Sequence, residues 1–407
     1  MTKICDVAII GAGPYGLSLA AHLKARNIDF RIFGKPLDTW RAHMPKDMLL
    51  KSDGFASNLD APEEGHTLKA YCAAEGHAYA DTGRPVPLDL FNRYAGWFQT
   101  RWVPDLEETH VVSLARSPNG FALALETGER FEARQVVGAV GITWFAHMAP
   151  TLANLPDWAA SHSFAHRDVS QFKNREVIVL GAGASAIDLA ALLKDSGADV
   201  RVMARAERVR FHVAADPTDT SFLRQVQQPT TSIGPGWRSF FCANTPLLFH
   251  RLPETIRLRA TKSHLGPAPG WFMRERVEGR IPTLLGRDIL HAQTEGDRVA
   301  LRVAERSGAQ TTLTCDHVIA ATGYRPELHK LPFLAPALLR SIAQAENTAI
   351  LSDQFETSVP GLYFTGPAAA NSFGPLMRFM AGAEFAAPRL AAQLARKLGA
   401  TRLKRAA

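Results

Sequence analysis

Two stretches of this chain share one pattern, and that repeat limits the fold more than any other feature. The first reads CDVAIIGAGPYGLSLAAHL from Cys5, and the second reads REVIVLGAGASAIDLAALL from Arg175, about 170 residues later. In each, an apolar strand runs into a Gly-x-Gly turn and then into a helix of small residues. Such a turn between a parallel strand and a helix cradles the phosphates of a dinucleotide. The chain is therefore predicted to build two such cradles.

The first glycine turn fits the full pattern G-x-G-x-x-G with Gly11, Gly13 and Gly16. The first glycine allows the tight turn, the second lets the backbone approach a pyrophosphate, and the third lets the helix pack closely on the strand. We expect a strand over residues 4–10 before the turn. A helix over about 14–26 is expected after it, with Pro14 in its first turn.

A second strand is expected over about residues 29–33, completing a βαβ-type unit. An acidic residue usually stands at the end of this strand and binds the adenosine ribose. Here the sequence reads Phe33-Gly34-Lys35, and Asp38 is the nearest acid. The pyrophosphate contact is therefore predicted more firmly than the ribose contact.

The second glycine turn follows a strand over residues 176–180 and has Gly181 and Gly183, with Ala186 in the third position. A helix over about 185–194 and a strand over about 199–203 are expected next. Arg205 stands at the end of that strand, with Arg201 and Arg208 close by. Arginine at this position suits the 2′-phosphate of NADP, so this turn is predicted to bind NADPH; the alternative is that these arginines are solvated surface charges.

Two further turns near the end of the chain are candidates for cofactor contacts. After a strand expected over residues 317–321, Thr322 and Gly323 form a sharp turn. A strand over 362–365 then leads into Gly366 and a long Ala-rich helix. The N–H groups of this last turn are predicted to face a flavin.

Composition narrows the class of protein. The chain has 407 residues, 46% of them hydrophobic and 21% charged, which is typical of a globular protein with two or more domains. The net charge of +7 is dispersed, so an anionic nucleotide cofactor explains it at least as well as nucleic acid does. No apolar run is long enough to span a membrane. We expect a cytoplasmic enzyme, with no nucleic-acid or membrane partner and with a homodimer as an open possibility.

The spacing of the cysteines and histidines argues against a redox disulfide and against a metal site. The four cysteines, Cys5, Cys72, Cys242 and Cys315, include no CxxC pair, so neither a zinc site nor a redox disulfide is predicted. His162 and His166 are four residues apart, a spacing that ligates metal on a helix. They lie in a Ser/His stretch before a strand, and no third ligand is evident. A hinge or NADP-contacting role is favoured for them.

These spaced elements resemble the flavoproteins that bind two dinucleotides, over most of the chain. Three finer stretches resemble class B flavin-dependent monooxygenases, the group that includes flavin-containing and N-hydroxylating monooxygenases. They are TWRAHMP with Trp40, LLKSDGFASNLDAP with Lys51, Ser52 and Asn58, and ATGY at 321–324. The stretch WAASHSFAHRD resembles a degenerate form of the group's fingerprint. Within the group, bacterial proteins similar to urate hydroxylases and to lysine or ornithine N-hydroxylases are nearest.

The resemblance implies a reaction and a role for one residue. NADPH would reduce FAD, O2 would form a flavin hydroperoxide, and one oxygen atom would pass to a small organic substrate by hydroxylation or N-oxygenation. Asn58, in a segment that resembles the group's flavin-facing asparagine segment with two extra residues, would donate a hydrogen bond there. The alternatives are an NADPH-dependent flavoprotein reductase or oxidase, and a non-catalytic nucleotide-binding redox sensor.

The predicted fold class is α/β with two Rossmann-like domains. Residues 1–155 and 311–407 would form a discontinuous FAD domain, and 156–310 an inserted NADPH domain. Within the insert, residues 210–290 are predicted to form a helical, aromatic-rich lid, whose Trp237, Phe240, Phe241 and Trp271 either line a substrate cavity or pack the lid down. The predicted catalytic residue is Asn58, and the predicted cofactor-binding residues are Gly11, Gly13, Pro14, Gly16, Trp40, Lys51, Ser52, Gly181, Gly183, Ser185, Arg205, Thr322, Gly323 and Gly366.

Overall fold

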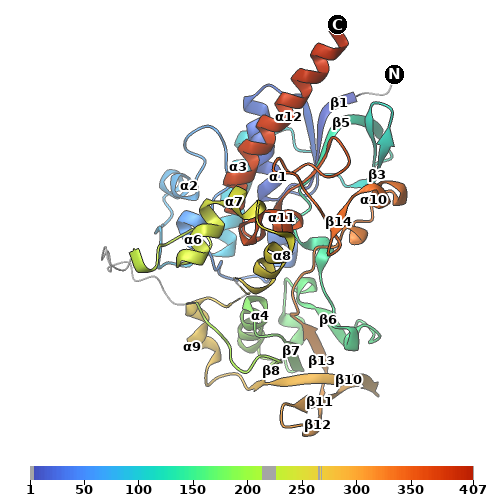
Figure 1. Ribbon diagram of the computed structural model, residues 1–407. Helices are drawn as coiled ribbons and strands as arrows, with labels where there is room; N and C mark the ends of the chain where they lie inside the picture. The colour runs from blue at the N-terminus through green and yellow to red at the C-terminus, as the bar shows by residue number, and fades with distance from the viewer. Residues whose placement is uncertain (1–3, 213–225, 265, 267, 407) are drawn as a thin grey trace.

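The computed structural model describes residues 4–212, 226–264, 266 and 268–406, and it contains two parallel sheets (Figure 1). In the first sheet, drawn at the top of Figure 1, the strand order is β2-β1-β5-β4-β3. Strand β4 pairs with the first residues of β5, and β16 pairs with its last three, Val136–Gly138. The pairs β1–β2, β1–β5 and β5–β16 are parallel, while β3 and β4 form an antiparallel extension. Its strands are β1 (Ile4–Ile10), β2 (Phe30–Phe33), β3 (Val111–Ser117), β4 (Gly120–Leu125), β5 (Arg130–Gly138) and β16 (Leu362–Phe364).

The second sheet lies below the first in Figure 1 and has the order β6-β13-β7-β8-β9, with every pair parallel. A three-stranded antiparallel sheet, β10-β11-β12, lies beside it. The strands of these two sheets are β6 (Ala160–His162), β7 (Glu176–Leu180), β8 (Asp199–Ala204), β9 (Thr283–Leu285), β13 (His317–Ala320), β10 (Arg287–Glu295), β11 (Arg298–Glu305) and β12 (Gln310–Cys315).

The two predicted strand–turn–helix units are present. Strands β1 and β7 are largely apolar, as expected for strands that packed elements cover on both faces; the exceptions are Glu176 and Asp6, which pairs with Arg134. Helix α1 (Pro14–Ala25) and helix α4 (Ala184–Asp195) begin directly after the two glycine turns. Most of the side chains of α1 are buried, partly against the long C-terminal helix α12 (Gly382–Ala406). The predicted α/β fold class is therefore confirmed.

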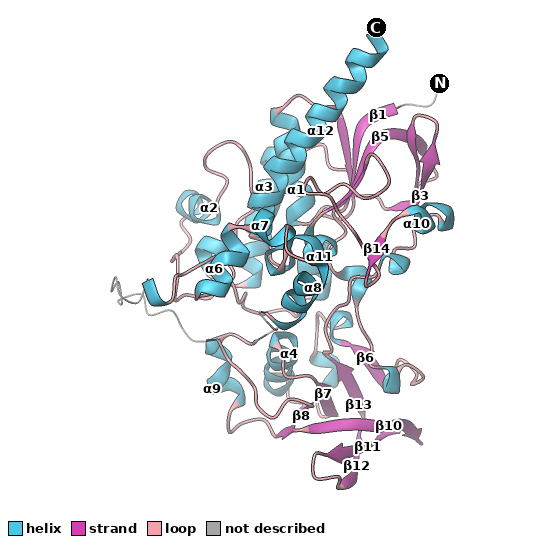
Figure 2. Cartoon of the chain, in the orientation of Figure 1, coloured by secondary structure: helices cyan, strands magenta, loops and turns pink. Residues whose placement is uncertain are grey.

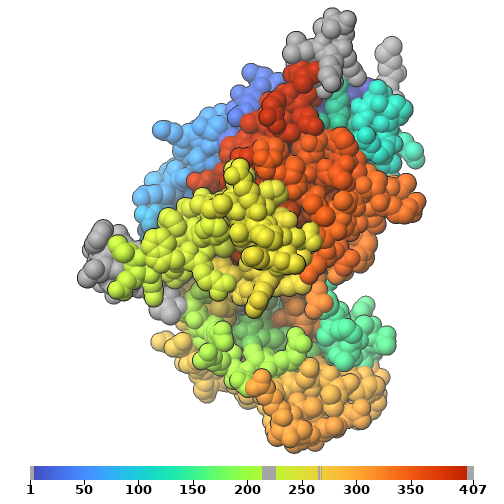
Figure 3. All heavy atoms as spheres, in the orientation of Figure 1, coloured from blue at the N-terminus to red at the C-terminus, as the bar shows by residue number. Residues whose placement is uncertain are grey.

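Part of the predicted lid is helical, whereas residues 283–285 form β9 and residues 287–290 begin β10; residues 213–225, 265 and 267 lie outside the described residues. Helix α6 (Trp237–Asn244), α7 (Pro246–His250) and α8 (Glu254–Ser263) pack against α11 (Ala370–Phe373) and its neighbours. Cys242 and Phe249 belong to the core of the first sheet. In Figure 3 these yellow helices press directly on the red C-terminal part of the chain. These three helices of the insert therefore pack on the region of the first sheet, whereas Met273, Val277 and β9 belong to the second sheet and its core.

The strand pairing also differs from the boundary predicted at residue 310. Strand β13 pairs with β7, so the chain as far as residue 320 belongs to the second sheet. The apolar run of β13 looks alike for either sheet, which is why the sequence alone did not assign it. The helix predicted directly after Gly366 begins instead at Gly382, because short turns and α11 intervene.

The remaining elements surround the two sheets (Figure 2). No helix among the described residues is both long enough and apolar enough to cross a membrane. The remaining α-helices and strands are α2 (Leu68–Glu75), α3 (Leu88–Trp102), α9 (Arg274–Val277), α10 (Pro336–Ser341), β14 (Gln344–Ala345) and β15 (Thr348–Ala349).

Candidate functional site

The first glycine turn has the geometry that its sequence predicts. Gly11 has φ +117°, and a Cβ atom there would lie 2.2 Å from the carbonyl oxygen of Ala139. A Cβ at Gly16 would lie 1.9 Å from the carbonyl oxygen of Gly11. Gly13 is different, because a Cβ there meets no atom within 4 Å. Gly11 and Gly16 thus let the strand and helix pack closely, and Gly13 leaves open space where a phosphate group fits.

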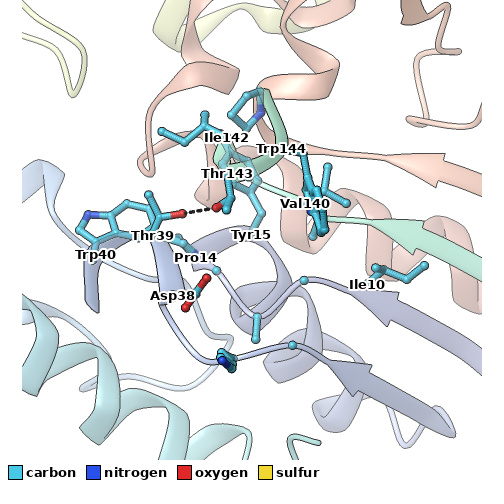
Figure 4. A pocket seen from close by; sticks show the side chains of 18 of the residues that line it. Ile10, Pro14, Tyr15, Asp38, Thr39, Trp40, Val140, Ile142, Thr143 and Trp144 are labelled. Atoms are coloured by element: carbon cyan, nitrogen blue, oxygen red, sulfur yellow. Dashed lines mark hydrogen bonds between the residues drawn. The ribbon is translucent and has the colours of Figure 1, made fainter. Parts of the chain in front are cut away.

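A groove of about 1200 Å³, part of it open to solvent, runs past this turn (Figure 4). Its walls come from the glycine turn, the end of β2, the π-turn Thr39–His43 and the chain after β5. The hydroxyl groups of Thr39 and Thr143, 3.0 Å apart, join two of these walls. The indole N–H of Trp40 is buried without a hydrogen-bond partner in the described structure, although Trp40 lines the groove. The predicted residues Gly11, Gly13, Pro14 and Trp40 are therefore gathered at one groove.

Tyr15 fixes the far wall of the groove. Its buried hydroxyl donates its one hydrogen to the carbonyl oxygen of Phe379 at 2.7 Å and lies 3.1 Å from the carbonyl oxygen of Met377. A Cβ at Gly366 would lie 3.1 Å from the Tyr15 ring, so Gly366 stands where the chain passes over this side chain. Phe379 and Met380 line the groove beyond Tyr15. Helix α1 is thus tied to the C-terminal segment that closes the site.

A cluster of titratable side chains lies between the two glycine turns, and sequence reasoning found only one of its members. The Lys51 ammonium lies 5.7 Å from the centre of the Phe379 ring. Burial lowers the pKa of Lys51, and the neighbouring charge of Asp188 opposes this shift. Burial also raises the pKa of Asp188 on α4 to about 7, while Lys51 and Arg276 act to lower it.

Two atoms of this cluster lack partners in the described structure. They are Oδ1 of Asp188 and Nε2 of His212, both buried. Burial lowers the pKa of His212 to about 4, and the charge of Lys51 contributes. Buried polar atoms are normally hydrogen-bonded, so two orphans beside one lysine indicate a place for a ligand. The sequence signal for Asp188 was an acid inside the otherwise apolar helix AIDLAALL.

Ser52 and Asn58 hold their own loop together. The Ser52 hydroxyl is 2.8 Å from the hydroxyl of Ser57. The Asn58 amide donates to the carbonyl oxygen of Phe55 and accepts from the backbone N–H of Leu68, at the start of α2. These contacts use one of the two amide hydrogens of Asn58. Its predicted role as a donor to a bound ring is not tested by this geometry and stays a prediction.

The second glycine turn, like the first, begins with a left-handed glycine that has no room for a side chain. Gly181 has φ +137°, and a Cβ there would lie 2.6 Å from the carbonyl oxygen of Ala321. Gly183 caps α4 in an extended conformation, and Ser185 is exposed in the first turn of the helix. The turn thus presents the start of α4 to solvent, as the phosphates of a second dinucleotide require.

Of the three arginines near the end of β8, two fit the phosphate role predicted for them. Arg205 and Arg208 are exposed, and neither forms an ion pair with another described residue. Arg201 instead pairs with Glu176 at 3.3 Å and donates to the carbonyl oxygen of Thr314 at 2.6 Å. Its side chain therefore braces the second sheet against β12 and is not available to share the role.

Thr322 and Gly323 join the two sheet regions. The Gly323 carbonyl accepts from the backbone N–H of His147 at 3.0 Å and pairs with Nε2 of His162 at 3.1 Å. The Thr322 hydroxyl donates to the carbonyl oxygen of His147. These bonds connect the two places where the chain crosses between sheets, and the hinge or NADP-contacting role favoured for His162 stays a prediction. The cofactor contact predicted for Thr322 and Gly323 stays a prediction.

His166 is part of a buried hydrogen-bond chain. His317 Nδ1 faces the carbonyl oxygen of Trp158 at 2.7 Å and must carry a proton, so its Nε2 accepts from the Ser161 hydroxyl at 2.7 Å. The Ser161 oxygen then accepts from His166 Nε2 at 2.6 Å, and His166 Nδ1 accepts from Gln171 at 3.3 Å. Both imidazoles are neutral in this arrangement. Burial, followed by the neighbouring His317 and His162, lowers the pKa of His166 to about 4.

The buried hydrogen-bond chain around His166 predicts that the protein loses stability in mild acid. The unfolded state binds a proton at His166 near pH 6.5, and the folded state only near pH 4, so stability falls as the pH drops from 6.5 to 4. Between pH 7 and pH 5 we expect His166 to account for about 2 kcal/mol. Urea unfolding at both pH values should show that His166→Gln removes this share of the pH dependence. His291→Gln, at an exposed side chain on β10, is the control, because it removes a histidine that lies outside this buried hydrogen-bond chain.

Comparison with known proteins identifies relatives of this chain. A family model for pyridine nucleotide-disulphide oxidoreductases matches residues 8–229. A ferredoxin–NADP reductase from Ignicoccus hospitalis is 20% identical over 362 residues, which are 89% of this chain and 89% of that protein.

Solved structures of two other enzymes have similar folds. An ornithine N-hydroxylase from Kutzneria sp. 744, solved with reduced FAD, NADP+ and L-ornithine, has a TM-score of 0.75 at 16% identity and covers 97% of this chain and 100% of its own. A bacillithiol disulfide reductase from Staphylococcus aureus has a TM-score of 0.64 at 17% identity, covering 97% and 99%. At these identities the likeness concerns the fold.

Proposed function

This chain belongs to the pyridine nucleotide-disulphide oxidoreductase family, and within that family we propose that it is a flavoprotein monooxygenase. It takes electrons from NADPH and adds one oxygen atom of O2 to a small organic substrate. Bound FAD supplies the ring that accepts the electrons of NADPH and reacts with O2. The main observation behind this proposal is the presence of two glycine turns, one on each parallel sheet, with a titratable cluster between them.

The residues of the first groove fit FAD. The open space beside Gly13 is where the pyrophosphate would lie, with the N-terminus of α1 directed at it. The orphaned indole N–H of Trp40 needs an acceptor, which a bound cofactor would supply. Met380 and Phe379 lie at the other end of the groove and offer an apolar surface for the flavin ring. The Tyr15 hydrogen bond holds that surface in place.

NADPH would lie on the second glycine turn, with its 2′-phosphate on Arg205. The nicotinamide end would then reach the junction where Asp188 and Lys51 lie between the two regions. An acid with a pKa of about 7 is half protonated near neutral pH, so Asp188 can accept a hydrogen bond or donate one. Lys51 balances its charge. We propose that this pair orients the nicotinamide and that Asn58, with its second amide hydrogen, faces the ring.

The cysteines favour a monooxygenase over a disulfide reductase. All four are free and buried, and the sequence has no CxxC pair. Burial raises the pKa of Cys5 to about 12 and of Cys315 to about 11, so neither forms a reactive thiolate near neutral pH. The ornithine N-hydroxylase also superposes better than the bacillithiol disulfide reductase.

An NADPH-dependent flavoprotein reductase is the second candidate, because curated relatives are named ferredoxin–NADP reductase. A product assay separates the two. Protein loaded with FAD is incubated with NADPH and O2 together with amines, amino acids, ketones or purines, and products are identified by mass spectrometry. A monooxygenase should yield a product one oxygen atom heavier, with O2 consumed in step with NADPH. NADPH oxidation that requires added ferredoxin, with no oxygenated product, would identify a reductase.

A further inference from the structure

The first glycine turn lacks an acid where the adenosine ribose is usually bound. Gly34 occupies that position at the end of β2, with φ +129°, and a Cβ there would lie 3.3 Å from the backbone nitrogen of Ala12. Lys35 follows it and lines the groove, but an ammonium cannot accept hydrogen bonds from ribose hydroxyl groups. A ribose bound in this groove would therefore need a hydrogen-bond acceptor from another segment.

The chain turns back over the glycine turn directly after this point. Leu37 adopts φ +54°, a conformation that is rare outside glycine, and its N–H donates to the carbonyl oxygen of Ala12 at 3.0 Å. This bond ties the loop after β2 to the middle of the glycine turn. The next residue is Asp38, which lines the groove and lies beside Pro14 in Figure 4. The loop geometry thus returns an acid to the groove four residues after Gly34.

Asp38 is held in place on one side only. Its Oδ2 lies 3.3 Å from Nε2 of His43, at the other end of the π-turn. The His43 ring stacks on Phe164 with 3.8 Å between ring centres, and its Nδ1 is 3.3 Å from the Phe164 carbonyl oxygen. No contact described for Asp38 uses Oδ1. One carboxylate oxygen is therefore anchored, and the other is available to a ligand.

We propose that Asp38 binds the adenosine ribose hydroxyl groups of the dinucleotide in this groove, and that His43 positions it. The identity of the dinucleotide as FAD rests on the proposed function, but the ribose contact does not depend on oxygenation. His43 also links Asp38 to a residue outside the groove, because its ring stacks on Phe164, in the segment that precedes the second glycine turn.

Nucleotide binding to the protein freed of FAD tests the ribose contact without an activity assay. ADP and 2′-deoxy-ADP are titrated by calorimetry or by competition with FAD. Wild-type protein should bind ADP about tenfold to a hundredfold more tightly, because 2′-deoxy-ADP lacks one hydroxyl that donates to a carboxylate. In Asp38→Ala the two affinities should become equal. An affinity ratio that survives in Asp38→Ala, or a wild-type ratio near one, would overturn the proposal.

Matched variants separate binding from folding and from charge. Lys35→Ala should weaken both nucleotides together and keep their ratio, because Lys35 contributes charge and no acceptor. His43→Ala should reduce the ratio, and His43→Gln, whose amide can donate from a similar position, should restore most of it. If Asp38→Ala proves unstable, Asp38→Leu removes both carboxylate oxygens from a side chain of similar size, and a ratio equal to wild type there would also contradict the proposal. A wild-type protein that binds ADP selectively yet forms no oxygenated product would contradict the proposed function alone.

Discussion

Gly13→Val should give a folded protein that binds almost no FAD. Gly13 has φ −83°, a conformation that valine adopts readily, and a Cβ there meets no atom within 4 Å. The protein therefore accepts the side chain, and its two methyl groups fill the space reserved for the pyrophosphate. Losing two charge-assisted hydrogen bonds from the turn costs about 3–6 kcal/mol, so the FAD affinity should fall by about a hundredfold or more.

The flavin content after purification, read from visible absorbance, checks this result, and thermal unfolding of the FAD-free proteins checks the fold. Gly399→Val is the control, because it places the same side chain in open space on α12, away from the groove. Gly11→Ala should behave in the opposite way and damage the fold itself, since its Cβ would lie 2.2 Å from a backbone oxygen. A Gly13→Val protein that stays yellow would show that FAD does not lie on this turn.

Arg205→Ala should remove the preference for NADPH over NADH. Arg205 is exposed at the end of β8 and has no ion-pair partner among the described residues, so its guanidinium is available to the 2′-phosphate. Losing a charge-assisted hydrogen bond of about 1.5–3 kcal/mol should lower kcat/KM for NADPH by about tenfold to a hundredfold. NADH lacks this phosphate, so its kcat/KM should barely change. Steady-state kinetics with both cofactors give the ratio.

Arg201→Ala is the matched control for this experiment. Because Arg201 pairs with Glu176 and with the carbonyl oxygen of Thr314, its loss should lower stability and leave the cofactor ratio unchanged. Arg208 is exposed nearby, so the double variant of Arg205 and Arg208 measures any share that it carries. A wild-type preference for NADH, or equal damage to both cofactors in Arg205→Ala, would show that the second turn does not select NADPH through this arginine.

The sequence predicted the strand–turn–helix units closely because their constraints are local. A buried parallel strand, a left-handed glycine and a small-residue helix follow one another within about 20 residues, and each can be read from residue type. Helix α1 begins at Pro14, as expected, and Gly11 and Gly181 have the positive φ angles that such turns require. Arg205 also lies where the pattern placed it.

The sequence could not assign features that depend on distant contacts. The pairing of β13 with β7 follows from packing about 140 residues away, and nothing in an apolar run names its neighbour. The sequence pattern also does not show that Arg201 pairs with Glu176, because that residue stands next to it only across the sheet. Asp188 and His212 were missed because they lie far apart in the sequence, and only folding brings them toward Lys51.

The first sheet is assembled from both ends of the chain, and this has a consequence for synthesis on the ribosome. Strand β5 pairs with β1 on one side and with β16 on the other, and Gln135 on β5 donates to the carbonyl oxygen of Leu394 on α12. A nascent chain can complete the second sheet as soon as β13 emerges, because all its strands lie within residues 160–320. The first sheet gains β16 only after residues 362–364 have left the exit tunnel, and α1 gains its cover only after α12 has followed. Until then, one edge of β5 and the face of α1 that α12 covers are exposed, and both are surfaces that chaperones recognise.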